Sequence, residues 1–376
     1  MNQVALQHPL RRLISLTCML CILAGCTYPT SISTLVPDAQ QSSPASTESL
    51  EQDIQGDILS DSEIATLSSL EKIDDYPLYT MHFSGSYSLV SLPQYVTWRA
   101  FPEAALDNSW AASSPWACSL FAALGDQGNM YFGRNFDWEY SPALLLFTDP
   151  PDGYASVSMV DIAYFGFTGN EAVTVTDLPL AERQALLDAP FMPFDGMNEQ
   201  GLVIGMAAVP PGNMIPDPGK TTLGSLQVIR LILDRAANVQ EAIDIFHSYN
   251  VVMRGGPPLH YLIADSHGQA VLVEFHQGEI VVIPNQAPWH QATNFLRASV
   301  GESTEGVCWR YDRIQQRLTE SNGKLDSVEA LELLRDVAQE GTQWSVVYGI
   351  SGGDVSVAMG RAFGETHTFR LMTSTD

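Results

Sequence analysis

Short apolar runs bounded by Gly, Asp and Pro dominate the chain from residue 118 onward. Runs of this kind, rich in β-branched and aromatic side chains, are typical of β-strands. The sequence predicts strands at residues 118–124, 129–133, 156–164, 202–208, 261–264, 270–275, 279–283, 344–350 and 366–372. One or two further strands are expected within residues 77–90.

Helical periodicity interrupts this strand pattern in the second half of the chain. Apolar positions recur at helical spacing in residues 225–236, 239–248, 310–318 and 327–339. Asn238 with Glu241 and Asp326 provide N-terminal capping signals for two of these segments. Strands at both ends with helices gathered between them predict an α+β fold, in which helices cover mainly antiparallel sheets.

The N-terminus carries an export signal. Arg11 and Arg12 precede an apolar run at residues 13–24, which is too short to span a bilayer as a stable helix. The run ends in Leu-Ala-Gly-Cys at residues 23–26, which resembles the bacterial lipobox, whose cysteine is acylated. We therefore expect lipidation of Cys26. An ordinary secretory signal is the alternative, and either interpretation exports the protein.

Charge and composition then divide the chain. The sequence of 376 residues is 45% hydrophobic and has a net charge of −25, from 43 acidic and 18 basic residues, which disfavours a nucleic-acid partner. Residues 26–75 are rich in Ser, Thr, Pro and acids and predict a disordered tether. The predicted division is a signal peptide at 1–25, this tether, a propeptide or small retained fragment at 76–117, and a catalytic domain at 118–376.

Export leaves few cysteines for chemistry. Cys18 and Cys21 leave with the signal peptide, and Cys26 is used for lipid if the lipobox is real. Cys118 and Cys308 remain, and a disulfide between them is one interpretation in an oxidising compartment. The surroundings of Cys118 favour a reactive thiol instead.

Those surroundings are a hairpin that begins at Cys118, turns at residues 125–128 and returns through 130–133. Arg134 and Asp137 follow the returning strand and are therefore expected near Cys118. A permanent cation favours the thiolate, and a carboxylate can orient a neighbouring amine. If Cys118 were the first residue of its chain, its α-amino group, with an ordinary pKa of about 7.7–8.0, could accept the thiol proton. A structural ion pair beside a buried cysteine is the alternative.

This arrangement resembles the choloylglycine hydrolase, penicillin V acylase and acid-ceramidase-like group of linear amide hydrolases. In that group Arg and Asp follow the nucleophilic cysteine by the same offsets as Arg134 and Asp137 follow Cys118, inside a similar Gly-Arg-Asn-x-Asp motif. Weaker matches follow in the family's order at residues 195–202, 260–265, 293–294, 310–313 and 343–345.

The resemblance implies a four-layer αββα N-terminal-nucleophile fold, a small N-acyl amide substrate and no cofactor or metal. It implies cleavage between Ala117 and Cys118, after which the Cys118 α-amine serves as base. Asn294 and the backbone N–H of Ala208 are implied as oxyanion donors. Arg310 is implied as the second active-site arginine, ahead of Arg313. The side chain of Ala208 departs from bile-salt hydrolases, which puts bile-salt preference in doubt.

Two other functions are compatible with parts of the sequence. A papain-like protease would pair Cys118 with His260 or His290 and use Asn294, but the local cysteine signature of that family is absent. A surface lipoprotein that keeps the fold as a silent binding module is a second alternative, and a homo-oligomer is left open. Residues 349–353 fit a G-x-S-x-G nucleophile elbow, which is disfavoured because a strand rather than a helix is predicted after Ser351.

Lipidation can be tested directly. Metabolic labelling with a palmitate analogue should mark the wild-type protein and not Cys26→Ser, because the acyl chain needs that thiol. Label that persists after Cys26→Ser would contradict the predicted lipid anchor. The anchor is expected at the outer membrane or periplasmic face of a Gram-negative cell, or at the surface of a Gram-positive one.

Overall fold

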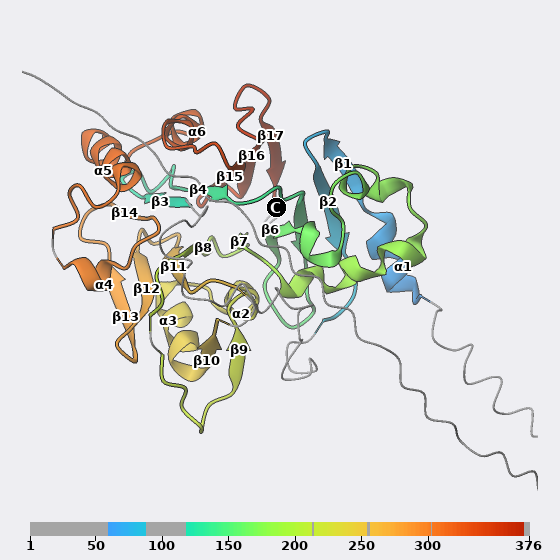
Figure 1. The fold of residues 1–376 in the computed structure, drawn as a ribbon, viewed down its shortest axis with the longest axis horizontal. Helices are drawn as coiled ribbons and strands as arrows, with labels where there is room; N and C mark the ends of the chain where they lie inside the picture. Colours follow the sequence, from blue (N-terminus) through green and yellow to red (C-terminus); the bar gives the residue numbers. More distant parts are fainter. Residues whose placement is uncertain (1–58, 88–117, 213, 254–255, 302, 372–376) are drawn as a thin grey trace, which may run out of the picture. The chain divides into compact units, whose positions relative to one another are not determined.

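The computed structural model describes residues 59–87, 118–212, 214–253, 256–301 and 303–371 (Figure 1). The predicted signal peptide, Cys26, Ala117 and most of the predicted tether lie outside these residues. Residues from Asp57 onward form one compact unit. In its described part, two large sheets carry the fold.

The larger sheet has nine strands, and its neighbours are antiparallel except for β2 and β5, which are parallel. In spatial order the strands are β1 (Glu71–Asp74), β2 (Leu78–Phe83), β5 (Ala143–Thr148), β6 (Ser156–Asp161), β7 (Asp195–Asn198), β8 (Val203–Ala208), β11 (Leu259–Ala264), β12 (Ala270–His276) and β13 (Glu279–Pro284).

The smaller sheet has six strands and is antiparallel throughout. In spatial order they are β14 (Trp289–Ala292), β3 (Ser119–Ala123), β4 (Tyr131–Asp137), β15 (Thr342–Gly349), β16 (Asp354–Met359) and β17 (His367–Arg370). A separate parallel pair is formed by β9 (Thr222–Gly224) and β10 (Asn250–Val252).

Helices cover the outer face of each sheet (Figure 1). The α-helices are α1 (Asp61–Ser68), α2 (Gln227–Arg235), α3 (Val239–Ser248), α4 (Arg297–Val300), α5 (Trp309–Ser321) and α6 (Ser327–Asp336), and the 3-10 helices are η4 (Ile162–Phe165), η5 (Glu171–Val173), η6 (Val175–Asp177) and η7 (Leu180–Phe191). Helices α2 and α3 pack on the larger sheet, where the ring centres of Phe246 and Tyr261 are 5.1 Å apart. Helices α5 and α6 pack on the smaller sheet.

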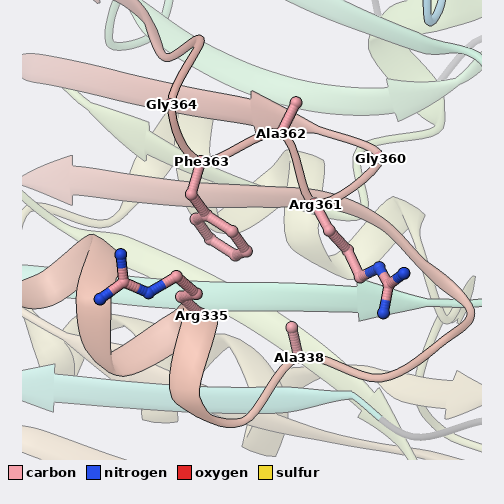
Figure 2. Close-up of a pocket in the computed structure, with 7 residues that line it drawn as sticks. All are labelled: Arg335, Ala338, Gly360, Arg361, Ala362, Phe363 and Gly364. Carbon is pink, nitrogen blue, oxygen red and sulfur yellow. The ribbon is translucent and has the colours of Figure 1, made fainter.

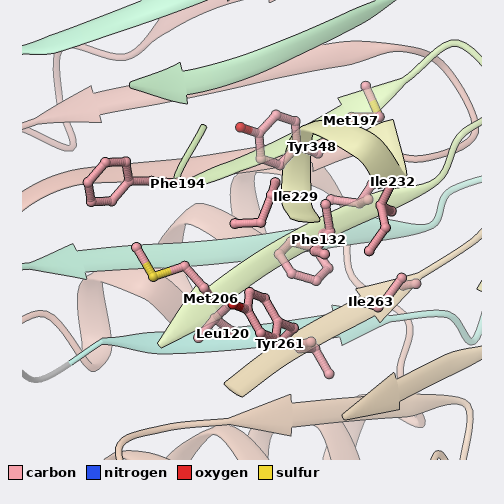
Figure 3. Close-up of a cluster of buried hydrophobic side chains, with 14 of the residues drawn as sticks. Leu120, Phe132, Phe194, Met197, Met206, Ile229, Ile232, Tyr261, Ile263 and Tyr348 are labelled. Carbon is pink, nitrogen blue, oxygen red and sulfur yellow. The ribbon is translucent and has the colours of Figure 1, made fainter. Parts of the chain in front are cut away.

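The main hydrophobic core fills the space between the two sheets and continues to α2, whose Ile229 and Ile232 belong to it (Figure 3). Alternation along β3 and β4 points Leu120 and Phe132 inward, where they meet Gly205 of β8. A Cβ added at Gly205 would lie 2.8 Å from Leu120, so the sheets approach too closely there for any side chain. The order helix, sheet, sheet, helix confirms the predicted αββα architecture.

The N-terminal boundary of the fold differs from the prediction. Residues 26–75 were expected to be a disordered tether, but Ser60 and Glu63 form a capping box that opens α1. Leu67 is fully buried in α1, and Leu70 is nearly so. The helix and β1 escaped notice because their apolar positions are few. The folded unit therefore begins before Cys118, and β2 is an integral strand of it.

The other predicted elements can be compared one by one. All nine strands predicted from residue 118 onward and all four helices are found, with ends shifted by a few residues. In the predicted strand at 156–164, β6 ends at Asp161 and gives way to η4. Strands β5, β7, β9, β10 and β14 were not individually predicted. In the described residues, no helix is both long and apolar enough to cross a membrane.

Candidate active site

Cys118 lies directly before β3 and belongs to the core between the sheets, together with Leu120. Its exposed fraction is 2%. Burial raises the pKa of the thiol, while the positive charge of Arg134 and the backbone N–H of Asp137 oppose that shift. The buried thiol therefore needs a base before it can act as a nucleophile.

Arg134 reaches the inter-sheet space from β4, and its side chain is fully buried. It donates to the carboxylate of Asp195, on β7 of the opposite sheet. Its guanidinium carbon lies 4.9 Å from the centre of the Phe136 ring. Asp195 also accepts a hydrogen bond from the Tyr348 hydroxyl of β15. The cation beside the thiol is thus held by contacts from both sheets.

Asp137 ends β4 and is fully buried. Its carboxylate accepts a hydrogen bond from the Thr342 hydroxyl, beside an irregularity in the pairing of β15 with β4. Burial raises the pKa of Asp137 to about 6, although Thr342 and the positive charges of Arg310 and Arg134 favour the carboxylate. Its second oxygen, Oδ2, has no hydrogen-bond partner in the described residues.

A chain of hydrogen bonds links the remaining predicted residues to Cys118. Arg310, in the first turn of α5, donates to the carbonyl oxygen of Cys118 and, at 2.9 Å, to the Ser119 hydroxyl. Its other terminal nitrogen donates to Asn294 Oδ1 at 3.0 Å, and Asn294 Nδ2 donates to Ala208 O at 2.8 Å. These two contacts fix which way the Asn294 amide faces and leave its second N–H for another acceptor.

Ala208 presents its backbone to the same side. Val209 N–H donates to Pro258 O, so the alternation of an antiparallel ladder turns the N–H and C=O of Ala208 away from β11. On that side β7 pairs with β8 only as far as Gly205. The N–H of Ala208 and the side chain of Asn294 therefore face one region beside Cys118.

Sequence reasoning placed these six residues together but missed their supports. Asp195 lies within the motif at 195–202, yet nothing in the sequence paired it with Arg134. Tyr348 and Thr342 lie on β15, and their contacts depend on how the two sheets stack. Asn198 of the same motif is structural, since its side chain bonds four backbone groups, of Leu233, Ala236, Gln200 and Leu202.

The alternative site residues lie elsewhere or are occupied. Arg313 is partly exposed and pairs with Asp336 at 2.6 Å. Ser351 is followed by strand β16, as predicted, so it is not a nucleophile elbow. His290 donates from Nε2 to Ile283 O, and its Nδ1 accepts from Gln291 N–H, so neither nitrogen is free to act as a base. Its pKa is lowered by burial to about 4.

Other features of the described residues bear on the rival interpretations. Cys118 and Cys308 are both free thiols, so the disulfide interpretation is wrong for this structure. No group of three His, Cys, Asp or Glu side chains in the described segments could hold a metal ion. A surface pocket near residues 360–364 includes Arg335 and Arg361, whose guanidinium groups point apart (Figure 2). It contains none of the predicted site residues.

The raised pKa of Asp137 predicts a pH-dependent stability. A carboxyl group with a raised pKa holds its proton more tightly in the folded state, so stability falls as pH rises from the ordinary value of 3.8 to about 6. Asp137→Asn should therefore raise the free energy of unfolding at pH 8 by on the order of 2–3 kcal/mol, and by little near pH 3. Urea unfolding at both pH values measures this.

Asp161 provides the matched comparison, because burial raises its pKa to about 7 and it belongs to none of the predicted site motifs. Asp161→Asn should show the same pH-dependent gain. A loss of stability for Asp137→Asn that is equal at pH 3 and pH 8 would contradict the assignment.

The part of the chain that carries this site is similar to known proteins. Residues 118–298 match the family described as linear amide C–N hydrolases, choloylglycine hydrolase family. A conjugated bile acid hydrolase variant from Clostridium perfringens has a TM-score of 0.50 at 16% sequence identity, and the match covers 68% of this chain and 92% of that one. The penicillin V acylase from Agrobacterium tumefaciens has a TM-score of 0.44 at 16% identity, covering 64% and 83%. The segment that begins at Cys118 is therefore similar to the linear amide C–N hydrolases of the choloylglycine hydrolase family, the family that its motifs resemble.

Proposed function

We propose that the protein is a lipid-anchored, extracytoplasmic hydrolase of small N-acyl amides that acts through a thioester at Cys118. The observation that supports this most is the hydrogen-bonded series from Cys118 O through Arg310 and Asn294 to Ala208 O. It brings residues from four separate parts of the chain to one thiol that also lies beside Arg134 and Asp137.

The base is the α-amino group of Cys118, released by cleavage after Ala117. Burial raises the pKa of the thiol, so the thiol of an uncut chain is a weak nucleophile. In the uncut chain it also has no adjacent α-amine to accept its proton. In the described residues neither His260 nor His290 is hydrogen-bonded to Cys118. This argues against the papain-like alternative. The carboxylate of Asp137 can orient the new ammonium group.

Hydrolysis then proceeds in two balanced steps. The amine takes the thiol proton, sulfur attacks the substrate carbonyl carbon, and the oxyanion receives hydrogen bonds from Asn294 Nδ2 and Ala208 N–H. The ammonium returns the proton to the departing amine as the C–N bond breaks. The free α-amine next deprotonates water, which attacks the thioester, and the acid leaves as the thiol is reprotonated.

The N-terminal fragment stays attached after cleavage in this proposal. Strand β2 pairs with β5 from Leu78 to Phe83, and its first four residues are buried. The hydroxyl of Tyr87 also donates to Asp234 of α2 at 2.9 Å. A lipid on Cys26 would thereby keep the catalytic fragment at the membrane without a covalent link.

Substrate choice is the open part of the proposal. N-acyl amides such as penicillin V, conjugated bile acids, N-acyl homoserine lactones and N-acylethanolamines form the panel to screen. A silent binding module is the rival outcome, and it predicts no Cys118-dependent turnover on any member of the panel.

Cleavage is the first requirement of the mechanism. Sequencing of active protein should find a new N-terminus at Cys118. Cys118→Ala should remain uncut, because the thiol attacks the Ala117 carbonyl, the peptide C–N bond breaks to free the α-amine, and water hydrolyses the resulting thioester. The two fragments should co-elute in gel filtration. A fully active protein that is continuous through Ala117 and Cys118 would contradict the proposal and favour a papain-like mechanism.

Arg134 and Asp137 test the chemistry. Arg134→Ala and Asp137→Ala should each lower kcat/KM by at least roughly a hundredfold, or about 2.7 kcal/mol of transition-state stabilisation. Asp161→Asn, a buried carboxylate with no place in the mechanism, should retain activity. Folded variants of both site residues with near-full kcat/KM would make the pair structural.

A further inference from the structure

Another buried carboxylate holds the segment that follows Asn294. Glu274 of β12 is fully buried and accepts three hydrogen bonds. Its Oε1 meets His260 Nδ1 at 3.1 Å and Arg297 N–H at 2.9 Å, and its Oε2 meets Ala298 N–H at 2.8 Å. The mechanism proposed above uses none of these groups.

Two of the three donors belong to the segment that carries Asn294. Arg297 and Ala298 begin α4, three and four residues after Asn294. The side chain of Arg297 donates to the hydroxyl of Tyr311, which is the residue after Arg310 in α5. Glu274 therefore holds one end of a short segment whose other end bonds Arg310 and Ala208.

The third donor connects Glu274 to the strand of Ala208. His260 of β11 pairs with Ala207 of β8, the residue directly before Ala208. Its ring is 1% exposed, and Nε2 has no hydrogen-bond partner in the described residues, so the bond from Nδ1 to Glu274 sets the orientation of the ring. One carboxylate thus links the segment that carries Asn294 to β11, the strand that pairs with β8 and Ala208.

The charged form of Glu274 is the one that these contacts favour. Burial raises the pKa of a carboxyl group, but the bonds from His260 and from the two backbone N–H groups outweigh burial and lower the pKa of Glu274. An uncharged amide of the same shape could not satisfy all three donors, because one of its two positions carries N–H groups. Replacement of Glu274 by glutamine should therefore displace the segment that carries Asn294, although the new side chain fills the same space.

We infer that Glu274, oriented by His260, is a positioning residue that fixes Asn294 relative to Ala208 and so sets the geometry of the oxyanion site. The inference deepens the proposed function and rests on it for its catalytic consequence. Because oxyanion donors act on the transition state, the effect should be on kcat more than on KM.

Glu274→Gln is the test variant, and Asp265→Asn is its matched control. Asp265 follows β11 at the opposite end of the same hairpin, is fully buried and also accepts three backbone N–H bonds, from Val239, His267 and Gln269. On a substrate that the wild-type protein hydrolyses, Glu274→Gln should lower kcat at least about tenfold with KM within about twofold. Asp265→Asn should leave kcat unchanged even if both variants lose stability.

Combination with Asn294→Ala shows whether Glu274 acts through that side chain. The double variant should be no slower than Asn294→Ala alone, because the residue being positioned is already missing. Full kcat in Glu274→Gln would overturn the inference, and so would an effect that multiplies with that of Asn294→Ala.

Hydrogen exchange supplies a readout that needs no activity. Amides of residues 293–301 should exchange faster in Glu274→Gln than in the wild type, and not in Asp265→Asn. Unchanged exchange there would overturn the positioning role. Faster exchange in Glu274→Gln, together with a wild-type protein that hydrolyses no amide, would support the positioning role and refute the proposed function alone.

Discussion

The ion pair between Arg134 and Asp195 is the contact on which the candidate site depends most directly. It joins β4 of the smaller sheet to β7 of the larger one, and neither side chain is exposed. Removing two charges from water is costly, and apolar residues of similar size often stabilise an interior as well or better. A buried pair at this position is therefore better explained by the need for a fixed cation beside Cys118.

The need for a fixed cation also explains why a charged side chain lies among aromatic ones in the core. Phe132 and Phe136 flank Arg134 on the inner face of β4, and Phe136 contacts Trp344 with ring centres 4.1 Å apart. Such packing excludes water and strengthens electrostatic interactions. The same dry surroundings raise the pKa of the Cys118 thiol, so the core that holds the Arg134 cation also disfavours the thiolate.

The sequence was informative wherever geometry is local. Cys118, Arg134 and Asp137 lie on one hairpin, so their offsets alone brought them together. Asn294 and Arg310 lie on separate elements and could be assigned only through the family resemblance. Asp195, Tyr348 and Thr342 gain their importance from the stacking of the two sheets, which no local pattern encodes.

Secondary structure follows the same division. Strand β5 reads as a continuous apolar run because both of its faces are covered, so it lacks the alternation that marks a strand. The pairing of β2 with β5 joins parallel segments 65 residues apart in the sequence, a long-range contact that periodicity cannot predict. The short polar helix α1 was lost for the opposite reason, since its helical pattern is too sparse.

The position of β2 inside the larger sheet, between β1 and β5, has a consequence for the life of the molecule. While the chain is continuous, docking β2 only closes a loop, and the entropic cost of closure grows slowly with loop length. A cut before Cys118 turns the same docking into association of two separate chains. The active form would then persist because it unfolds slowly, and not because unfolded molecules readily refold. Once unfolded, the cut protein could refold only if its two fragments met again, and dilution makes that encounter rare.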